Sequence, residues 1–475
     1  MKTSSKKIVC LHLQALFVWS VLCALVAMDN PARAASATWL ASPFNNNWIA
    51  APTTNNWSTG VGTFPGATSG TSNGDIASFT NASLITTINC GGAFVIGGFV
   101  FDSTNASAYT INVSSSGGAI GTWRLNNNAV VRVTSTVTNR QTINGQLRIA
   151  STGTANFVSD STTPTATLNI TGGVSVNNSG TSGTLYLGGT NTGPNIMGAY
   201  VEQGSPPIIF GTLIKTNSGL WVLTGNNTHH NNTLILGGTL MLMGSGAIPN
   251  SPVITVNGAT LNISNTLTSV NYMIVTNSGA LLLTNTFNRT PVTIGTLTAS
   301  NATFHLGVNG ATPFTNIVVT SVLDAGPGIT LAIDQVANLP VGMTFALISY
   351  TGTDPDPASF TVTGLPSGYT AGAVTVDTVN KLVTVTVTPS SVASSLVWTG
   401  SINSNWDTTT KNWVDATILT LQRTYANPDA TIFNDTAANG TVTLTAAFSP
   451  FNVAVTNYTR SYTFNGTGKI SGPMA

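Results

Sequence analysis

The chain has 475 residues, of which 42% are hydrophobic and only 6% are Asp, Glu, Lys or Arg. Soluble domains average about 25% of these charged residues, so Thr, Ser and Asn must supply most of the polar surface. The near balance of 15 basic and 14 acidic residues excludes a strong electrostatic attraction to nucleic acid or to anionic membranes.

The residue usage also favours strands over helices. Thr, Ser and Asn, together with 47 Gly and many Val and Ile, are suited to strands and turns and are poor in helix interiors. The length exceeds that of one ordinary compact domain, although an elongated fold relaxes that limit. We therefore predict an all-β protein with a large core.

The N-terminal segment 1–34 differs from the rest and is typical of a secretory signal peptide. Three lysines lie within the first seven positions, an apolar run follows from Ile8 to Met28, and Ala32 and Ala34 form a small-x-small cleavage site. A retained membrane anchor is the alternative, because the run is just long enough to span a bilayer. We expect an exported protein with a signal peptide at 1–34 and no membrane span in the mature chain.

Removal of the signal peptide leaves a nearly neutral chain with one thiol. Four basic and one acidic residue are lost with residues 1–34, so acidic side chains slightly outnumber basic ones in the remainder. Cys90 is then the only cysteine, so no disulfide can form within the mature chain. We interpret Cys90 as a small buried apolar residue, since no His or Lys stands beside it in the sequence.

Residues 35–115 are predicted to form an N-terminal β cap rich in Trp and Asn. Trp39, Trp48 and Trp57 stand among asparagines. Exposed Trp faces stack on sugar rings and Asn supplies hydrogen bonds, so these residues are candidate glycan contacts. The plainer interpretation is that the rings pack inside the cap.

Residues 116–300 are predicted to form a β-solenoid. A Gly followed closely by Leu and a short apolar burst recurs at irregular intervals, at Gly183, Gly211, Gly238, Gly258, Gly279 and Gly295. Short strands recurring about every 20 residues are typical of stacked coils, whereas strands of a β-sandwich are spaced about 8–12 residues apart. Stacked charges would repel one another, which offers one reason for the low charge.

Four arginines within this segment follow one another at a constant step of eight: Arg124, Arg132, Arg140 and Arg148. An even step keeps one face of an extended chain, so the row could bind an acidic polysaccharide. Intervening turns would break that geometry and leave the arginines as unrelated residues at solvated strand ends.

The C-terminal part divides at a Ser-rich linker. Residues 301–389 have longer alternating strands and Pro-containing turns, and they are predicted to be a β-rich terminal module that caps the solenoid. Residues 390–475 are predicted to begin a second, truncated copy of the long unit. The segment Asp429–Phe433 repeats the pattern of Asp75–Phe79, and the Trp pattern recurs at Trp398, Trp406 and Trp413.

The sequence shows no catalytic, metal or cofactor motif. Glu202 is the only Glu in the chain, so a glycosidase pair of carboxylates has no support apart from scattered Asp residues. Asp354 and Asp356 are interpreted as a solvated turn, and the adjacent His229 and His230 as an exposed turn. We predict that the protein is not an enzyme and requires no cofactor.

The stretch from Gly211 to Met243 resembles the autotransporter-associated β-strand repeat, also called the passenger-associated transport repeat. That family combines Gly-Thr-Leu, a Lys, a Gly-x-x-x-Leu-x-Gly-x-Asn-Thr phrase and a closing Gly-Thr-Leu. The positions that fit are Gly211, Leu213, Lys215, Gly219, Leu223, Gly225, Asn227, Thr228, Thr233, Gly238, Thr239 and Leu240. The segment at 229–232 departs from the family, which usually has an aromatic residue, Thr and two glycines there.

This resemblance implies a right-handed parallel β-solenoid, or β-helix, exposed at the bacterial surface or released. The expected role is that of a non-enzymatic adhesive or structural passenger, with surface glycans or envelope components as partners. The alternative is a carbohydrate-binding or polysaccharide-degrading β-helix protein. The resemblance gives no ligand and no oligomeric state.

Overall fold

The computed structural model describes most of the chain from Ser36 onwards, and the predicted signal peptide lies outside the described residues. The described ranges are 36–49, 53–68, 70–114, 123–149, 153–176, 183–202, 211–263, 269–283, 291–339, 341–366, 368–389 and 394–471. Apart from the 3-10 turn η2 (Pro357–Ser359), the regular structure in these ranges consists of strands. None of the described residues belongs to a helix that is long and apolar enough to cross a membrane.

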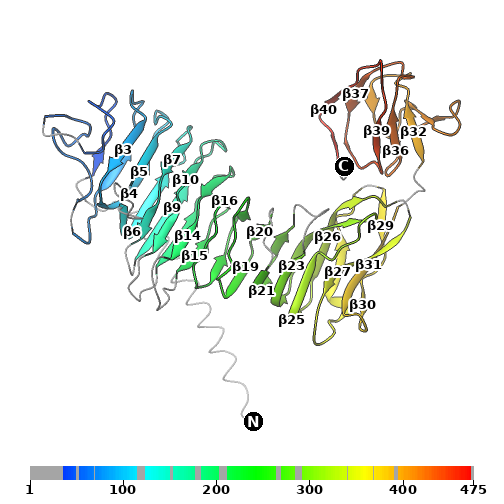
Figure 1. Ribbon diagram of the computed structural model, residues 1–475, viewed down its shortest axis with the longest axis horizontal. Helices are drawn as coiled ribbons and strands as arrows, with labels where there is room; N and C mark the ends of the chain where they lie inside the picture. Colours follow the sequence, from blue (N-terminus) through cyan, green and yellow to red (C-terminus); the bar gives the residue numbers. More distant parts are fainter. Residues whose placement is uncertain are drawn as a thin grey trace, which may run out of the picture.

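The long unit is a parallel β-solenoid built from two sheets, and Figure 1 shows its coils stacked side by side from β3 to β26. The first sheet contains β1 (Ala37–Thr38), β2 (Ile76–Phe79), β4 (Phe94–Phe101), β6 (Trp123–Val133), β8 (Leu147–Ile149), β9 (Thr154–Ser159), β11 (Val174–Val176), β12 (Thr184–Gly188), β14 (Tyr200–Glu202), β15 (Thr212–Lys215), β17 (Thr233–Ile235), β19 (Val253–Asn257), β21 (Ser269–Thr276), β23 (Val292–Ala299), β25 (Ile317–Ala325) and β27 (Met343–Ser349).

The second sheet faces the first and takes the intervening strands. It contains β3 (Thr87–Gly91), β5 (Thr110–Ser114), β7 (Gln141–Asn144), β10 (Leu168–Ile170), β13 (Asn195–Met197), β16 (Leu220–Leu223), β18 (Thr239–Leu242), β20 (Thr260–Ile263), β22 (Gly279–Leu282), β24 (Ala302–Asn309), β26 (Ile329–Ala337) and β28 (Phe360–Thr363). The predicted all-β solenoid is confirmed.

Each coil satisfies the backbone of its neighbours through parallel pairing in register. Thr184 pairs with Thr212 in the first sheet and Thr239 pairs with Thr260 in the second, so the coils differ in length along the stack. Alternate side chains point inwards, as in β15, where Leu213 and Lys215 are buried and the residues between them are partly exposed. One continuous apolar core runs between the sheets from Ala37 to Val387.

Most of the Gly-x-Leu phrases mark strand starts, and they do so on both sheets rather than at one position of the coil, whereas Gly295 lies inside β23. Gly183 and Gly211 precede strands that pair in the first sheet, and Gly238 and Gly258 precede strands that pair in the second. The step from Gly211 to Gly238 therefore crosses from one sheet to the other. The irregular steps reflect this change of sheet as well as loops of different length.

The parallel stack ends in antiparallel strands near residue 389. β27 pairs antiparallel with β31 (Leu382–Pro389), and β31 also pairs antiparallel with β29 (Tyr369–Ala371) and β30 (Thr375–Asp377). A strand that turns back supplies partners for an otherwise open sheet edge. The backbone at this end of the first sheet is thereby paired within the unit.

A second unit follows with its own core, and Figure 1 shows it beyond β29 and β31. Its strands are β32 (Ser395–Trp398), β33 (Asn405–Trp406), β34 (Trp413–Asp415), β35 (Gln422–Arg423), β36 (Ala430–Phe433), β37 (Thr441–Leu444), β38 (Ala447–Phe448), β39 (Val453–Val455), β40 (Thr463–Gly466) and β41 (Lys469–Ile470). β32, β36 and β39 pair parallel, in the same way as β1, β2 and β4 of the first unit.

Two glycines of similar backbone conformation provide a test of coil stacking. Gly238 has φ +60°, and a Cβ there would lie 2.4 Å from the carbonyl oxygen of Gly219 on the preceding coil; Gly244 has φ +63° and open space around it. We expect Gly238→Ala to lower the free energy of unfolding by about 1–3 kcal/mol more than Gly244→Ala, because both share the strain of positive φ and only Gly238 adds a backbone clash. Urea denaturation measures the difference, and equal losses would contradict it.

Candidate interaction surface

The three N-terminal tryptophans lie in the core, so the prediction that they contact glycans is wrong for this folded structure. Trp39, Trp48 and Trp57 have no exposed surface. The indole N–H of Trp57 donates to the carbonyl oxygen of Trp48 at 2.9 Å, and the two rings meet edge to face with centroids 4.7 Å apart. Ring faces packed against other aromatic rings are not available for a sugar.

The asparagines around these tryptophans fold a tight turn rather than form a sugar-binding surface. The buried Asn56 side chain donates to Asn45 Oδ1 at 2.7 Å and to the carbonyl oxygen of Asn47 at 2.8 Å. In the second unit, Asn412 makes the equivalent bonds at 2.7 and 2.8 Å. The spacing Asn-x-Asn-Trp followed by Asn-Trp in both copies is the sequence signal for this turn, which sequence reasoning missed.

The arginine row is not one row in the structure. Arg132, near the end of β6, pairs with Asp160 at 3.1 Å, and Arg140 is exposed just before β7. Arg124 on β6 and Arg148 on β8 are instead in-register neighbours on adjacent coils. Both alternate with buried residues, so both side chains point outwards from the first sheet. The structure thus brings two of the four arginines together.

A neutral polar surface covers the N-terminal part of the second sheet. Four successive coils align the triplets Thr87-Ile-Asn89, Thr110-Ile-Asn112, Thr142-Ile-Asn144 and Asn169-Ile-Thr171, in which the middle Ile is buried in the core. The first and third residues of the first three triplets point outwards, as does Thr171, whereas Asn169 is buried. Asn112 Nδ2 donates to Asn89 Oδ1 at 2.9 Å, and Asn144 Nδ2 donates to Asn112 Oδ1 at 3.2 Å. This asparagine ladder stabilises the stacked coils and leaves an uncharged hydrogen-bonding face.

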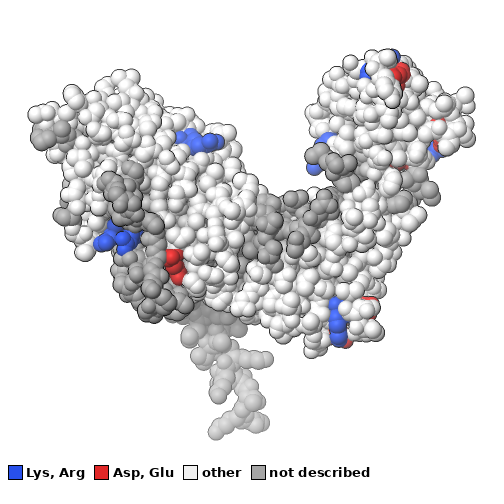
Figure 2. Space-filling model, in the orientation of Figure 1, with Lys and Arg blue, Asp and Glu red and all other residues white. Residues whose placement is uncertain are grey.

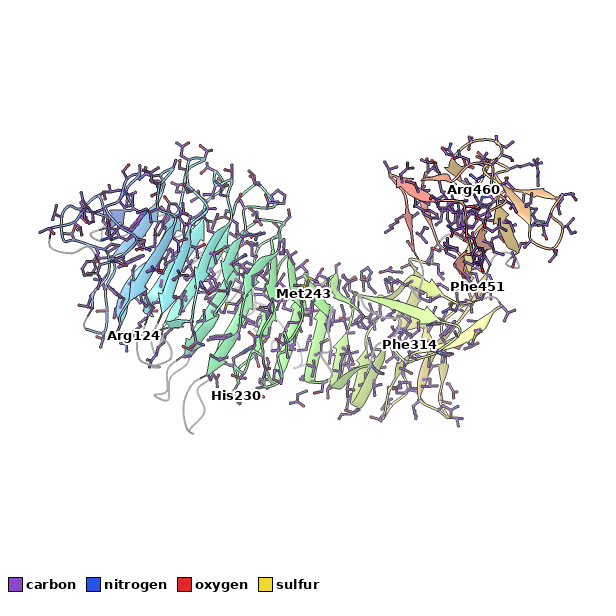
Figure 3. All side chains as sticks on the ribbon, turned by 45° about the horizontal axis from the view of Figure 1, so that its top comes forward. Arg124, His230, Met243, Phe314, Phe451 and Arg460 are labelled. Atoms are coloured by element: carbon purple, nitrogen blue, oxygen red, sulfur yellow. The ribbon has the colours of Figure 1, made fainter. Side chains whose placement is uncertain are left out.

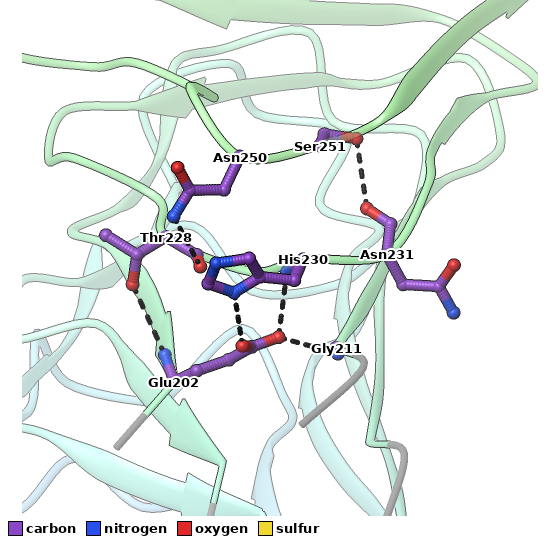
Figure 4. A network of polar contacts seen from close by, with 7 residues as sticks. All are labelled: Glu202, Gly211, Thr228, His230, Asn231, Asn250 and Ser251. Atoms are coloured by element: carbon purple, nitrogen blue, oxygen red, sulfur yellow. Dashed lines mark hydrogen bonds and ion pairs between the residues drawn. The ribbon is translucent and has the colours of Figure 1, made fainter. Parts of the chain in front are cut away.

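Glu202 is used in a structural contact, which Figure 4 shows at the end of β14. The Gly211 N–H and the His230 N–H both donate to Glu202 Oε1 at 2.8 Å, and His230 Nδ1 lies 2.6 Å from Glu202 Oε2. This carboxylate therefore holds the start of β15 and the turn before β17 next to β14. With its oxygens engaged in this way, the only Glu in the chain is not one of a free catalytic pair.

His229 is buried, and its interpretation as part of an exposed turn is wrong. Its Nε2 atom lies 2.8 Å from Thr233 Oγ1, and its ring packs against Tyr200 with centroids 5.3 Å apart. Burial lowers the pKa of His229 to about 3, and the neighbouring His230 contributes to the same shift. The imidazole is therefore neutral at pH 7.

Lys215 lies in the core at a coil corner, where a basic side chain is unusual. Its side chain is fully buried, and Nζ donates to the carbonyl oxygens of Thr216, Asn217 and Gly237 at 2.7, 2.9 and 2.9 Å. Burial lowers the pKa of Lys215 to about 7. Only the protonated form can donate all three bonds, which join the corner of one coil to the next.

The remaining sequence candidates have structural partners. Tyr350 Oη and Lys381 Nζ each donate to Asp354 Oδ1 at 2.7 Å, and Asp356 accepts the Ala358 N–H at the start of η2. Burial raises the pKa of the Cys90 thiol, which disfavours the reactive thiolate. Within the described ranges, no three His, Cys, Asp or Glu side chains are grouped to hold a metal ion.

Comparison with known proteins gives one partial similarity. A stretch of 101 residues, 20% of this chain, is 37% identical to part of the adhesin BmaC autotransporter of Brucella suis biovar 1 (strain 1330). The match covers 3% of that protein, so this chain spans only a small share of its relative's length. No protein-family model and no solved structure matches the chain. Part of this protein therefore resembles part of an autotransporter adhesin.

The Lys215 contact predicts a large loss of stability on mutation. Lys215→Met should lower the free energy of unfolding by about 3 kcal/mol or more, because three buried carbonyl oxygens lose their donor. Lys381→Met removes a partly exposed ion pair with Asp354 and should cost less than about 1 kcal/mol. Urea denaturation of both variants tests this, and similar small losses would show that the Lys215 bonds contribute little.

The buried His229 predicts weaker folding in mild acid. The unfolded chain binds a proton at His229 below its ordinary pKa of 6.5, whereas the folded chain does so only near pH 3. Stability is therefore full above pH 6.5 and falls as the pH is lowered, by up to about 1.4 kcal/mol per pH unit.

Denaturation between pH 6 and 5 measures this contribution, because that window lies above the range of ordinary carboxylates and below the lowered pKa of Lys215. His229→Phe should flatten the pH dependence because the titrating group is gone. The partly exposed His305, which pairs with Asp334 at 2.7 Å, supplies the control variant His305→Gln. If His229→Phe keeps the full slope, another group causes it.

Proposed function

We propose that this protein is an exported, non-enzymatic surface protein whose solenoid serves as an adhesive passenger. The observation that carries the proposal is the long parallel stack with uncharged polar faces, in which the acidic and histidine candidates Glu202, His229, Asp354 and Asp356 make structural contacts. On the face that Figure 2 shows, the described Lys, Arg, Asp and Glu residues lie in small separate patches among uncharged residues. Such a surface offers extended contact without steering by net charge.

The similarity to an autotransporter adhesin supports the same role and location. It covers a fifth of the chain, and it agrees with the resemblance of residues 211–243 to a passenger-associated repeat. Both similarities concern proteins exposed at or beyond the cell surface. The membership in that repeat family, the signal peptide and the adhesive role are parts of this proposal.

The absence of an enzymatic activity is also proposed from the contacts of the polar residues. Glu202, Asp354 and Asp356 hold turns together, and His229 is neutral and enclosed. Polysaccharide cleavage would require carboxylates or basic groups that converge on a substrate. For carbohydrate binding without cleavage, the buried tryptophans give no support, and the Arg124–Arg148 pair is the remaining candidate.

Cell attachment tests the proposed role. Cells that make the protein should lose it to added protease while intact, because an exposed solenoid is accessible from outside. Deletion of the gene should reduce attachment of these cells to a colonised surface, and restoring the gene should restore attachment. A chain that stays protected in intact cells contradicts surface exposure, and unchanged attachment of the deletion strain contradicts adhesion.

A further inference from the structure

The pair Arg124 and Arg148 breaks the pattern of the rest of the solenoid. Their Cα positions are direct partners in the parallel ladder between β6 and β8, where strands lie about 4.8 Å apart. Among the described in-register pairs, no other joins two like charges on adjacent coils. Two like charges on such neighbouring positions repel each other, and partial burial strengthens that repulsion because less water screens it.

The described residues supply no acid to offset this repulsion. Arg148 has a lowered pKa, caused first by burial and then by the charge of Arg124, and no carboxylate contributes. Its Nε atom is enclosed and has no hydrogen-bond partner among the described residues. The segments 115–122, 150–152, 177–182 and 203–210 contain no Asp or Glu in their sequence.

The residues before and after the arginine pair in the same column are neutral. Val95 stands before Arg124 and Ser175 after Arg148, each in register with the arginine beside it. Figure 3 marks Arg124 on the first coils, at the opposite end of the protein from Arg460 of the second unit. The two guanidinium groups therefore form an isolated cationic patch on the outer side of the first sheet.

We propose that the Arg124–Arg148 pair binds the carboxylate groups of an acidic polysaccharide. A guanidinium matches a planar carboxylate with two parallel hydrogen bonds, and two stacked guanidinium groups can share one negative group that relieves their repulsion. A polymer with a carboxylate on successive sugars would occupy this patch and continue over the neutral coils beside it.

The inference rests on the proposed adhesive function for its biological setting, and its test is independent of cells. Purified protein is titrated with polygalacturonate, with dextran sulfate, with neutral dextran and with vesicles of phosphatidylglycerol. Polygalacturonate should bind, and added salt should weaken binding because charges are paired. Binding to dextran sulfate alone, or to vesicles and not to polygalacturonate, overturns the proposal.

The other two arginines of the sequence row provide matched controls. Arg124→Gln and Arg148→Gln should each weaken polygalacturonate binding about tenfold or more, the loss expected for a charge-assisted pair. Arg132→Gln and Arg140→Gln should change it by less than about twofold, because Arg132 already pairs with Asp160 and Arg140 stands apart. Equal losses in all four variants would show unspecific charge attraction and would overturn the assignment.

Stability of the free variants separates binding from folding. Arg124→Gln removes one of two repelling charges, so its melting temperature without ligand should equal or exceed that of the unchanged protein. Weaker binding together with a lower melting temperature in both pair variants would indicate a structural role instead. If the variants bind normally while gene deletion still abolishes cell attachment, the adhesive function stands and this site is not responsible.

Discussion

The structure depends on the pairing of each coil with the next in parallel register. Strand backbones find their partners on adjacent coils, so residues one coil apart in the sequence become neighbours with the same orientation. Side chains at the same position of successive coils therefore lie next to one another in a column. Such stacking is favourable for apolar residues in the core and for Asn on the surface, where the amides form hydrogen-bonded ladders. It is unfavourable for like charges, because they repel one another. This constraint offers one reason for the 6% charged content.

Residues that violate the constraint are the informative ones. Lys215 places an amino group in the core, and three carbonyl oxygens of a coil corner accept hydrogen bonds from its Nζ atom. Glu202 is balanced by two backbone N–H groups and by His230. Arg124 and Arg148 stand in one column without a partner of opposite charge among the described residues. Lys215 and Glu202 have hydrogen-bond partners within the fold, whereas the two arginines are candidates for a partner outside the protein.

Much of the architecture could be predicted because it depends on local sequence patterns. Short apolar bursts, glycines at strand starts and the Trp pattern predict strands, coils and a repeated opening. The placement of single side chains was less accessible. Trp48 is apolar enough to suit either a core or a sugar, and only the surrounding rings decide between them. The step of eight describes how the arginines follow one another in the sequence. Which arginines become neighbours on adjacent coils depends instead on the coil length, and that length places Arg148 next to Arg124. The coil length differs from coil to coil because the loops at the corners differ in length, so the sequence of one strand does not predict it.

The closed end of the first unit has a consequence for how such a protein can change in length. β31 turns the first sheet back on itself, the second unit has an aromatic core of its own, and no described strand pairing joins the two units. Duplication of a whole unit would therefore leave every existing register unchanged, whereas insertion of half a coil would shift all columns beyond it. Duplication of whole units would therefore lengthen the protein in large steps without changing which side chains are neighbours on its surface.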